Sequence, residues 1–191
     1  MTTQEFEDQL NEKLKELAIN ERVLGMDHPK NATSYHSIGG SYLFMGEYQK
    51  ALEYFLKALP ILERVLGTDH PNTATSYHSI GGTYHFMGEY QKALQYRLKA
   101  LAIRERVLET DHPSTATSYG NIGGTYYSMG DYPKALEYYL KALPIFERVL
   151  GAKHQDTITT YSNVGGTYEL MGNSSKAQEY RQKAEDARSR R

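Results

Sequence analysis

The stretch YHSIGGSYLFMGEY, from Tyr35 to Tyr48, decides the fold of this chain because the chain repeats it. Closely related stretches begin at Tyr77, Tyr119 and Tyr161, each 42 residues after the one before it. Self-similarity at a fixed period of about 20 to 50 residues is typical of repeat proteins, in which small units stack on their neighbours. The sequence therefore predicts a stack of similar units and not one globular core.

Each period contains two segments with the apolar spacing of a helix. Tyr35, Ile38 and Tyr42 are three and four residues apart, which places them on one face of a first helix between Thr33 and Met45. The second segment carries an apolar stripe of Leu52, Phe55, Leu56, Leu59, Leu62 and Leu66, with Ala51 and Ala58 at points of close contact. Every unit is therefore predicted to be a helix–turn–helix.

Turn residues separate these segments. Gly46 fits the end of the first helix, and Gly67 fits the end of the second. In the following Asp-His-Pro, Asp69 is placed to cap the next helix, and Pro71 suits its first turn.

Proline inside the second helix conflicts with local helix propensity. It stands at positions 60 and 144, and proline in a helix interior is less favourable than alanine by about 3 kcal/mol. Because Ala18 and Ala102 occupy the equivalent positions, we expect the helix to continue through Pro60 and Pro144 with a bend.

The ends of the chain differ from the middle. Residues 4–25 align with a second helix only, so we expect this half repeat to expose Leu10, Leu14 and Leu17. The last segment replaces much of the leucine stripe with polar residues, as a capping repeat does. The predicted boundaries within a single domain are a half repeat at 1–26, repeats at 27–68, 69–110 and 111–152, and a C-terminal capping repeat at 153–191.

The composition narrows the class of protein. With 191 residues and a formal net charge of −1, no global field favours nucleic acid or an anionic membrane. The one basic cluster, Ala187 to Arg191, is predicted to be a frayed tail. The absence of cysteine excludes a disulfide framework, a thiolate metal site and a cysteine nucleophile. The acidic start resembles no signal sequence, and no apolar run approaches the roughly 20 residues of a membrane span, so we expect a cytoplasmic protein.

The spacing of the repeated residues resembles that of the tetratricopeptide repeat. The matching pattern is Tyr35-x2-Ile38-Gly39-x2-Tyr42, followed by Ala51, Phe55 and Ala58, with tyrosine where the family usually has tryptophan. The family's usual period is about 34 residues. The extra residues here, ILERVLG and Asp-His-Pro, are similar to the 42-residue repeats of kinesin light chains. The resemblance implies an all-α, right-handed superhelical solenoid of antiparallel helix pairs, with about four repeats after a leading half repeat.

The resemblance also suggests a role for the paired glycines. In the family, the position of Gly39 lies where paired helices approach closely, and Gly40 points to the concave surface. Glycine in a helix costs about 0.5–1 kcal/mol relative to alanine, and the pair recurs in all four repeats. Packing explains the first glycine; for the second, a bare groove floor and tolerance inherited through duplication both stay open.

No catalytic or metal-binding constellation is predicted. His28, His70, His112 and His154 recur in the loops, but packed helices lie about 8–10 Å apart, so these rings cannot share one metal. Capping of the following helix is the better account of these histidines. Ser37 next to His36 is no catalytic pair either, because successive helical residues point in different directions. We therefore expect no enzyme activity, no cofactor and no metal.

The family usually holds a peptide along a concave groove lined by the first helices. The groove positions implied here are His36, Ser37, Gly40, Leu43, Phe44, His78, Ser79, Gly82, His85, Phe86, Asn121, Gly124, Tyr127, Asn163 and Gly166. Asn121 and Asn163 match an asparagine that related repeats use to hold a peptide main chain. None of these positions carries lysine or arginine, so a neutral or apolar-anchored peptide is expected.

Two alternatives to this interaction scaffold remain at the level of sequence. The half repeat could stack on another copy through its leucines, giving a self-assembling module. The repeats could also be one portion of a larger multidomain protein.

Overall fold

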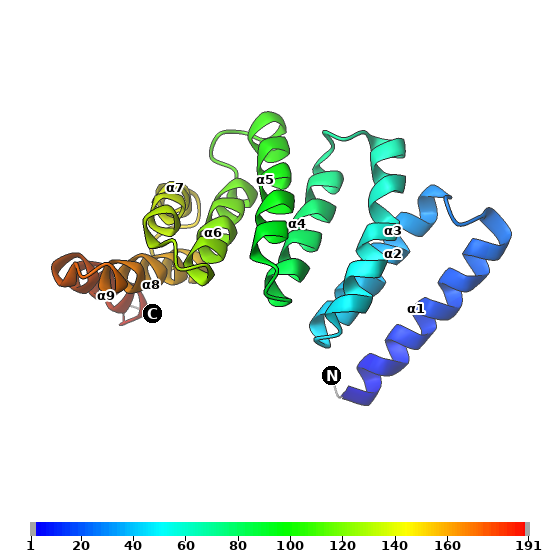
Figure 1. Cartoon of the computed structure of the whole chain (residues 1–191), viewed down its shortest axis with the longest axis horizontal. Coiled ribbons are helices and arrows are strands. Elements are labelled where there is room, and N and C mark those ends of the chain that lie inside the picture. The colour runs from blue at the N-terminus through cyan, green and yellow to red at the C-terminus, as the bar shows by residue number, and fades with distance from the viewer. Residues whose placement is uncertain (1–2, 190–191) are drawn as a thin grey trace. The chain divides into compact units, whose positions relative to one another are not determined.

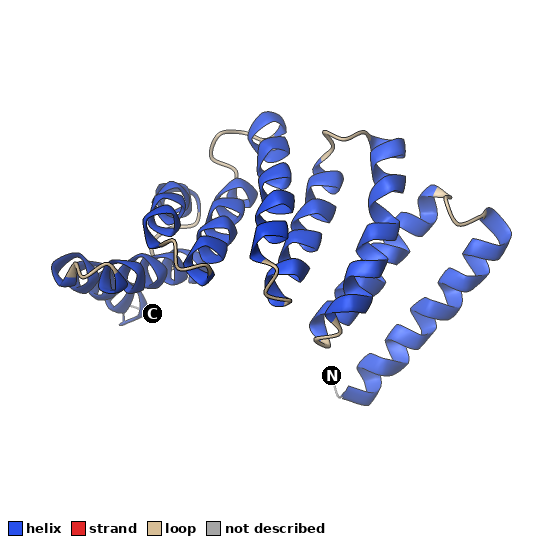
Figure 2. Ribbon diagram, viewed as in Figure 1, coloured by secondary structure: helices blue, strands red, loops and turns tan. Residues whose placement is uncertain are grey.

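The computed structural model describes residues 3–189, and in that range it contains nine α-helices and no strand (Figures 1 and 2). The helices are α1 (Thr3–Leu24), α2 (Pro29–Phe44), α3 (Tyr48–Leu66), α4 (Pro71–Phe86), α5 (Tyr90–Val107), α6 (Pro113–Ser128), α7 (Tyr132–Val149), α8 (Gln155–Leu170) and α9 (Ser174–Ser189). The predicted all-α class is confirmed.

The chain divides within α5, after Ile103, into two compact units. In the first unit, called unit 1, α2 packs against α3, and α1 and α4 pack against α2 and α3 respectively. In the second, unit 2, α6 packs against α7 and α8 against α9, while α7 also contacts α8. Helix pairs of the predicted kind are therefore present in both units.

The imidazole of a histidine begins each first helix. Nδ1 accepts the backbone N–H two residues later, at distances of 3.1–3.2 Å: His28 from Lys30, His70 from Asn72, His112 from Ser114 and His154 from Asp156. The predicted capping role of these histidines is confirmed. The prediction that Asp69 caps is wrong, because the capping position belongs to His70, directly before Pro71 at the first helical position.

Glycines with a positive φ mark the ends of α2 and α3. Gly46 after α2 has a φ of 75° and Gly67 after α3 has a φ of 91°, in the region where only glycine is unstrained. Both predicted helix stops are confirmed.

Both internal prolines lie inside unbroken helices. Pro60 lies within α3 and Pro144 within α7, so the predicted continuity is confirmed. Each proline is exposed, so that water can reach the carbonyl group that loses its helical N–H partner. The bend at these positions stays a prediction.

Stacked tyrosines fill the space beside each helix pair. In unit 1, Tyr42 stacks on Tyr54 with ring centroids 5.5 Å apart, and the Lys57 ammonium lies 5.1 Å from the Tyr54 centroid. Equivalent stacks occur at Tyr84–Tyr96, Tyr126–Tyr138 and Tyr168–Tyr180. These contacts explain why repeats without tryptophan are rich in tyrosine.

The two ends of the chain differ from expectation. Leu10 and Leu17 are buried, in one cluster with Tyr35 and Ile38 of α2, and Leu14 packs half-buried against the same cluster. The prediction that these three leucines are exposed is therefore wrong. At the other end α9 continues to Ser189 and buries Ala187, which contradicts a frayed tail from that residue onward. The last two residues of the predicted tail, 190 and 191, lie outside the described residues.

Candidate functional site

A cavity of about 230 Å³ opens in unit 1 between α2 and α4. It is lined by Ala32, Thr33, His36, Ser37, Leu62, Asn72 and Thr75. Of the predicted site residues, His36 and Ser37 take part in this lining, while the α4 candidates His78 and Ser79 do not. We call this space the unit 1 cavity.

A second cavity of about 180 Å³ opens in unit 2 between α6 and α8. It is lined by Thr117, Gly120, Asn121, Phe146, Asp156, Thr159, Thr160 and Asn163. This unit 2 cavity brings together Asn121 and Asn163, the two asparagines that the sequence singled out. It therefore has two amides, each able to donate and to accept, close to three threonine hydroxyls.

Each cavity also contains an apolar side chain that sequence reasoning missed. Leu62 comes from α3 and Phe146 from α7, so both belong to second helices, whereas the predicted site used first helices only. The two positions are equivalent and lie two repeats apart. A second-helix residue that is apolar in alternate repeats was the signal available in the sequence.

The first glycine of each pair is explained by packing. A Cβ atom on Gly39 would lie 2.8 Å from Cδ1 of Phe55, and one on Gly81 would lie 3.0 Å from the carbonyl oxygen of Ala93. At Gly123 the nearest atom would be Cδ1 of Tyr139 at 2.8 Å, while Gly165 is less crowded, with its nearest atom at 3.3 Å. The second glycines face open space: no atom would lie within 4 Å of a Cβ at positions 40, 82 and 166, and the nearest at Gly124 would be 3.6 Å away.

None of the second glycines, at positions 40, 82, 124 and 166, lines the unit 1 cavity or the unit 2 cavity. The bare groove floor therefore stays a hypothesis.

The predicted aromatic anchors lie at the C-terminal ends of three first helices, Phe44 in α2, Phe86 in α4 and Tyr127 near the end of α6. Phe44 is 78% exposed and Phe86 is 59% exposed, while Tyr127 is 37% exposed. Phe44 contacts Phe6 at 5.1 Å between ring centroids, and Phe86 stacks on Tyr48 at 5.6 Å. His85 lies beside Phe86. Leu43 is half-buried and packs against the core, so it is a weaker anchor than the others.

Burial favours the neutral form of two histidines of unit 1, His36 and His85. It lowers the pKa of His36, whose ring lies 5.0 Å from that of Phe55. Burial also lowers the pKa of His85, and the positive charge of Arg97 lowers it further. Because the charged form of each imidazole is disfavoured, the unit 1 cavity is uncharged at neutral pH.

Arginines approach the first helices from the second helices. Arg97 and Arg104 are 6% and 8% exposed, and Arg104 donates from Nη1 to Ser118 Oγ at 2.6 Å and to the carbonyl oxygen of Ser114 at 3.2 Å. Neither arginine lines the unit 1 cavity or the unit 2 cavity. The named groove positions carry no basic residue, as predicted. The prediction did not include Arg97 and Arg104, which belong to a second helix.

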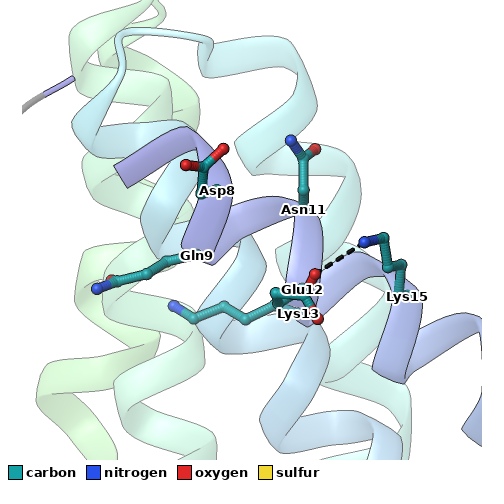
Figure 3. Close-up of a pocket in the computed structure, with 6 residues that line it drawn as sticks. All are labelled: Asp8, Gln9, Asn11, Glu12, Lys13 and Lys15. Carbon is teal, nitrogen blue, oxygen red and sulfur yellow. Dashed lines mark hydrogen bonds and ion pairs between the residues drawn. The ribbon is translucent and has the colours of Figure 1, made fainter. Parts of the chain in front are cut away.

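A surface depression of about 530 Å³ lies along α1 (Figure 3). Its lining residues are Asp8, Gln9, Asn11, Glu12, Lys13 and Lys15, which all come from this one helix. Glu12 and Lys15 form an exposed ion pair at 2.8 Å (Figure 3). With no second element and no buried polar group converging on it, this depression is a poor candidate for a site.

Among residues 3–189, no group of three or more His, Asp or Glu side chains is placed to hold a metal ion. None of the helices described there has the length and apolar character needed to cross a membrane.

Solved structures share this fold. BtubC (BKLC) from P. vanneervenii is 24% identical with a TM-score of 0.77, over 83% of this chain and 63% of that one. A Podosopora anserina protein with nearly identical TPR-like repeats, named after kinesin light chains, is 22% identical with a TM-score of 0.84, over 97% of this chain and 87% of that one. The apo form of RapI is 21% identical with a TM-score of 0.83, over 98% of this chain and 50% of that one.

No curated protein matches the chain. This chain spans 63% of the length of BtubC, and at these identities the likeness shows the fold alone.

The family is settled by the repeats themselves. The tetratricopeptide repeat model matches four overlapping stretches, residues 14–64, 32–106, 80–147 and 121–190. Together these stretches include all four Gly-Gly pairs and the helices on both sides of them. The chain belongs to the tetratricopeptide repeat family.

Proposed function

We propose that the chain is a non-catalytic scaffold that binds an extended segment of a partner protein, and that Asn121 and Asn163 grip the main chain of that segment. The observation that carries the proposal is the presence of both amides in the unit 2 cavity. A peptide unit offers one donor and one acceptor, and an asparagine side chain complements both without reading the sequence. Family membership supports an interaction role of this general kind.

The remaining residues favour a segment with apolar anchors. Phe146 lies in the unit 2 cavity and Leu62 in the unit 1 cavity, where each offers apolar surface beside hydroxyl groups. The unit 1 cavity has no charge at neutral pH, and the exposed rings of Phe44 and Phe86 provide further apolar contact area. A mainly neutral ligand suits these surfaces better than a strongly acidic one. A cytoplasmic location for this interaction stays a prediction from the sequence.

A random 12-residue peptide display library, selected on the full chain, tests the proposal. We expect selected peptides to bind the wild type and to lose most of their affinity for Asn121→Ala/Asn163→Ala, because both main-chain contacts are removed. The control is Asn11→Ala, which removes an exposed amide from α1, far from Asn121 and Asn163 in the sequence. Thermal melting should show that all three proteins are folded. Peptides that bind the double variant as tightly as the wild type would refute the proposed grip.

The competing proposal of self-stacking through the N-terminal leucines has lost its main support. Leu10 and Leu17 are buried within unit 1, so they are not available to another copy.

A further inference from the structure

We infer that the segment bound in the unit 2 cavity carries a lysine or arginine, and that Asp156 selects it. This inference rests on the proposed function and adds one positive side chain to an otherwise uncharged ligand. The partner is thus a protein segment with a single basic residue beside its main-chain contacts.

Asp156 is the only charged side chain in the lining of the unit 2 cavity. It lies in the first turn of α8, where the helix N-terminus favours a negative charge. Its side chain is 54% exposed, so a ligand can reach it.

The neighbouring histidine does not neutralise Asp156. Nδ1 of His154 lies 3.7 Å from the carboxylate, a distance that would suit an ion pair if this nitrogen carried a proton. However, the same Nδ1 accepts the backbone N–H of Asp156 at 3.2 Å, as the cap of α8. An imidazole nitrogen that accepts a hydrogen bond carries a lone pair and no proton. The carboxylate therefore presents its charge to the cavity.

The unit 1 cavity offers an internal comparison. Asn72 occupies there the position that Asp156 occupies in unit 2, two residues after the capping histidine. The threonines at 33 and 75 match those at 117 and 159, and Leu62 matches Phe146. The two cavities share a plan, but only that of unit 2 contains a carboxylate.

The amide and the carboxylate contact different parts of the ligand. Asn163 follows Asp156 by seven residues of α8, which corresponds to about 10 Å along a helix. No single peptide group spans that length. While Asn163 holds the main chain, a long basic side chain is the part of the segment suited to reach Asp156.

A double-mutant cycle tests this pairing. From the display library we take a peptide whose binding depends on Asn121 and Asn163 and which contains one lysine, and we synthesise it with lysine and with glutamine at that position. Dissociation constants of both peptides are then measured by fluorescence anisotropy for the full wild-type chain and for Asp156→Asn. Because Asn72 occupies the equivalent site of α4, we expect this variant to fold.

We expect the lysine to improve binding to the wild type about three- to fivefold and to have little effect on Asp156→Asn, as for a solvent-exposed ion pair. The difference should shrink when salt is raised from about 0.05 M to 1 M, which shortens the screening length to about 3 Å. Glu185→Gln, an exposed change of the same charge in α9, should bind both peptides as the wild type does.

The outcomes separate the two proposals. If peptides depend on the asparagines but the lysine effect is equal in wild type and Asp156→Asn, or the selected peptides contain no basic residue, the role of Asp156 is refuted and the main-chain grip stands. If no selected peptide depends on Asn121 and Asn163, both proposals fail.

Discussion

At the scale of single residues, the two adjacent glycines of a repeat have different structural roles. Gly81 lies against α5, where a Cβ atom would be 3.0 Å from the carbonyl oxygen of Ala93 and 3.1 Å from the backbone nitrogen of Arg97. Gly82, the next residue, would bring its Cβ atom within 4 Å of nothing. The first glycine is therefore required by the contact between two backbones, and the second is not.

This difference predicts opposite effects of the same substitution. Gly81→Ala should destabilise the protein by about 1–3 kcal/mol, because neither helix backbone can move away without disturbing its packing. Gly82→Ala should stabilise it by about 0.4–1 kcal/mol, because alanine restricts the unfolded chain and favours the helix. Urea unfolding followed by circular dichroism measures both. Equal midpoints for the two variants would contradict the packing explanation.

Residue roles were predictable from the sequence to different degrees. The helical glycines, the capping histidines and the pair Asn121 and Asn163 all follow from repeat register, which places equivalent residues in equivalent positions. Leu62 and Phe146 could not be assigned to the cavities, because which side of a second helix reaches between two first helices depends on how the pairs pack. The repeat register alone does not determine how the helix pairs pack.

At the scale of elements, a tyrosine of each first helix is tied to the second helix before it. The Tyr35 hydroxyl donates to Oε1 of Glu21 at 2.6 Å, and Tyr119 donates to Oε1 of Glu105 at 2.5 Å. Tyr77 with Glu63 and Tyr161 with Glu147 make the same bond. Burial, assisted by the glutamate, raises the pKa of Tyr77 and of Tyr119 to about 12. The pKa values of Tyr35 and Tyr161 are raised for the same reasons.

These raised values predict a loss of stability in alkali. An unfolded tyrosine titrates at about 10, whereas Tyr77 in the folded state titrates at about 12. The neutral phenol is therefore favoured by folding, and its contribution is complete below pH 10 and is lost as pH rises from about 10 through about 12. We expect the melting temperature to fall over that window, and to fall less in Tyr77→Phe, which has no phenol to ionise at this site.

At pH 7, Tyr77→Phe should also be less stable than the wild type, by about 1 kcal/mol for the lost hydrogen bond. Tyr132→Phe is the control, because the ring of Tyr132 contacts Tyr127 and this tyrosine is not one of the four that donate to a glutamate of the preceding second helix. If the control changes the alkaline profile as much as Tyr77→Phe does, then ionisation of the tyrosines bonded to glutamate is not the cause of the lower melting temperature.

At the scale of the whole molecule, the repeat register determines which surfaces are core. Leu17 aligns with Leu59, and both are buried, at 4% and 9% exposure. The sequence predicts α1 to be the second helix of a half repeat that exposes its leucines, whereas Leu10 and Leu17 pack against α2. The face equivalent to Ala51, Phe55 and Ala58 of α3 instead carries Gln9, Lys13 and Glu16, so the residues that would meet a preceding first helix are polar. Alignment identifies equivalent positions, but only the packing shows which neighbour each position meets.

This assignment gives the last prediction. If Leu17 belongs to the core that α1 shares with α2, Leu17→Ala should cost about 2–5 kcal/mol, the usual range for a leucine truncated in a packed interior. The cost should appear in the unfolding of unit 1, since repeat stability depends mainly on nearest neighbours. Val23→Ala is the matched control, because Val23 lies on the same helix at 68% exposure and should change stability little. Sedimentation over a hundredfold range of concentration completes the test. A Leu17→Ala protein that keeps its stability but loses a concentration-dependent mass seen in the wild type would restore Leu17 to an assembly surface, whereas lower stability with an unchanged mass profile places it in the core.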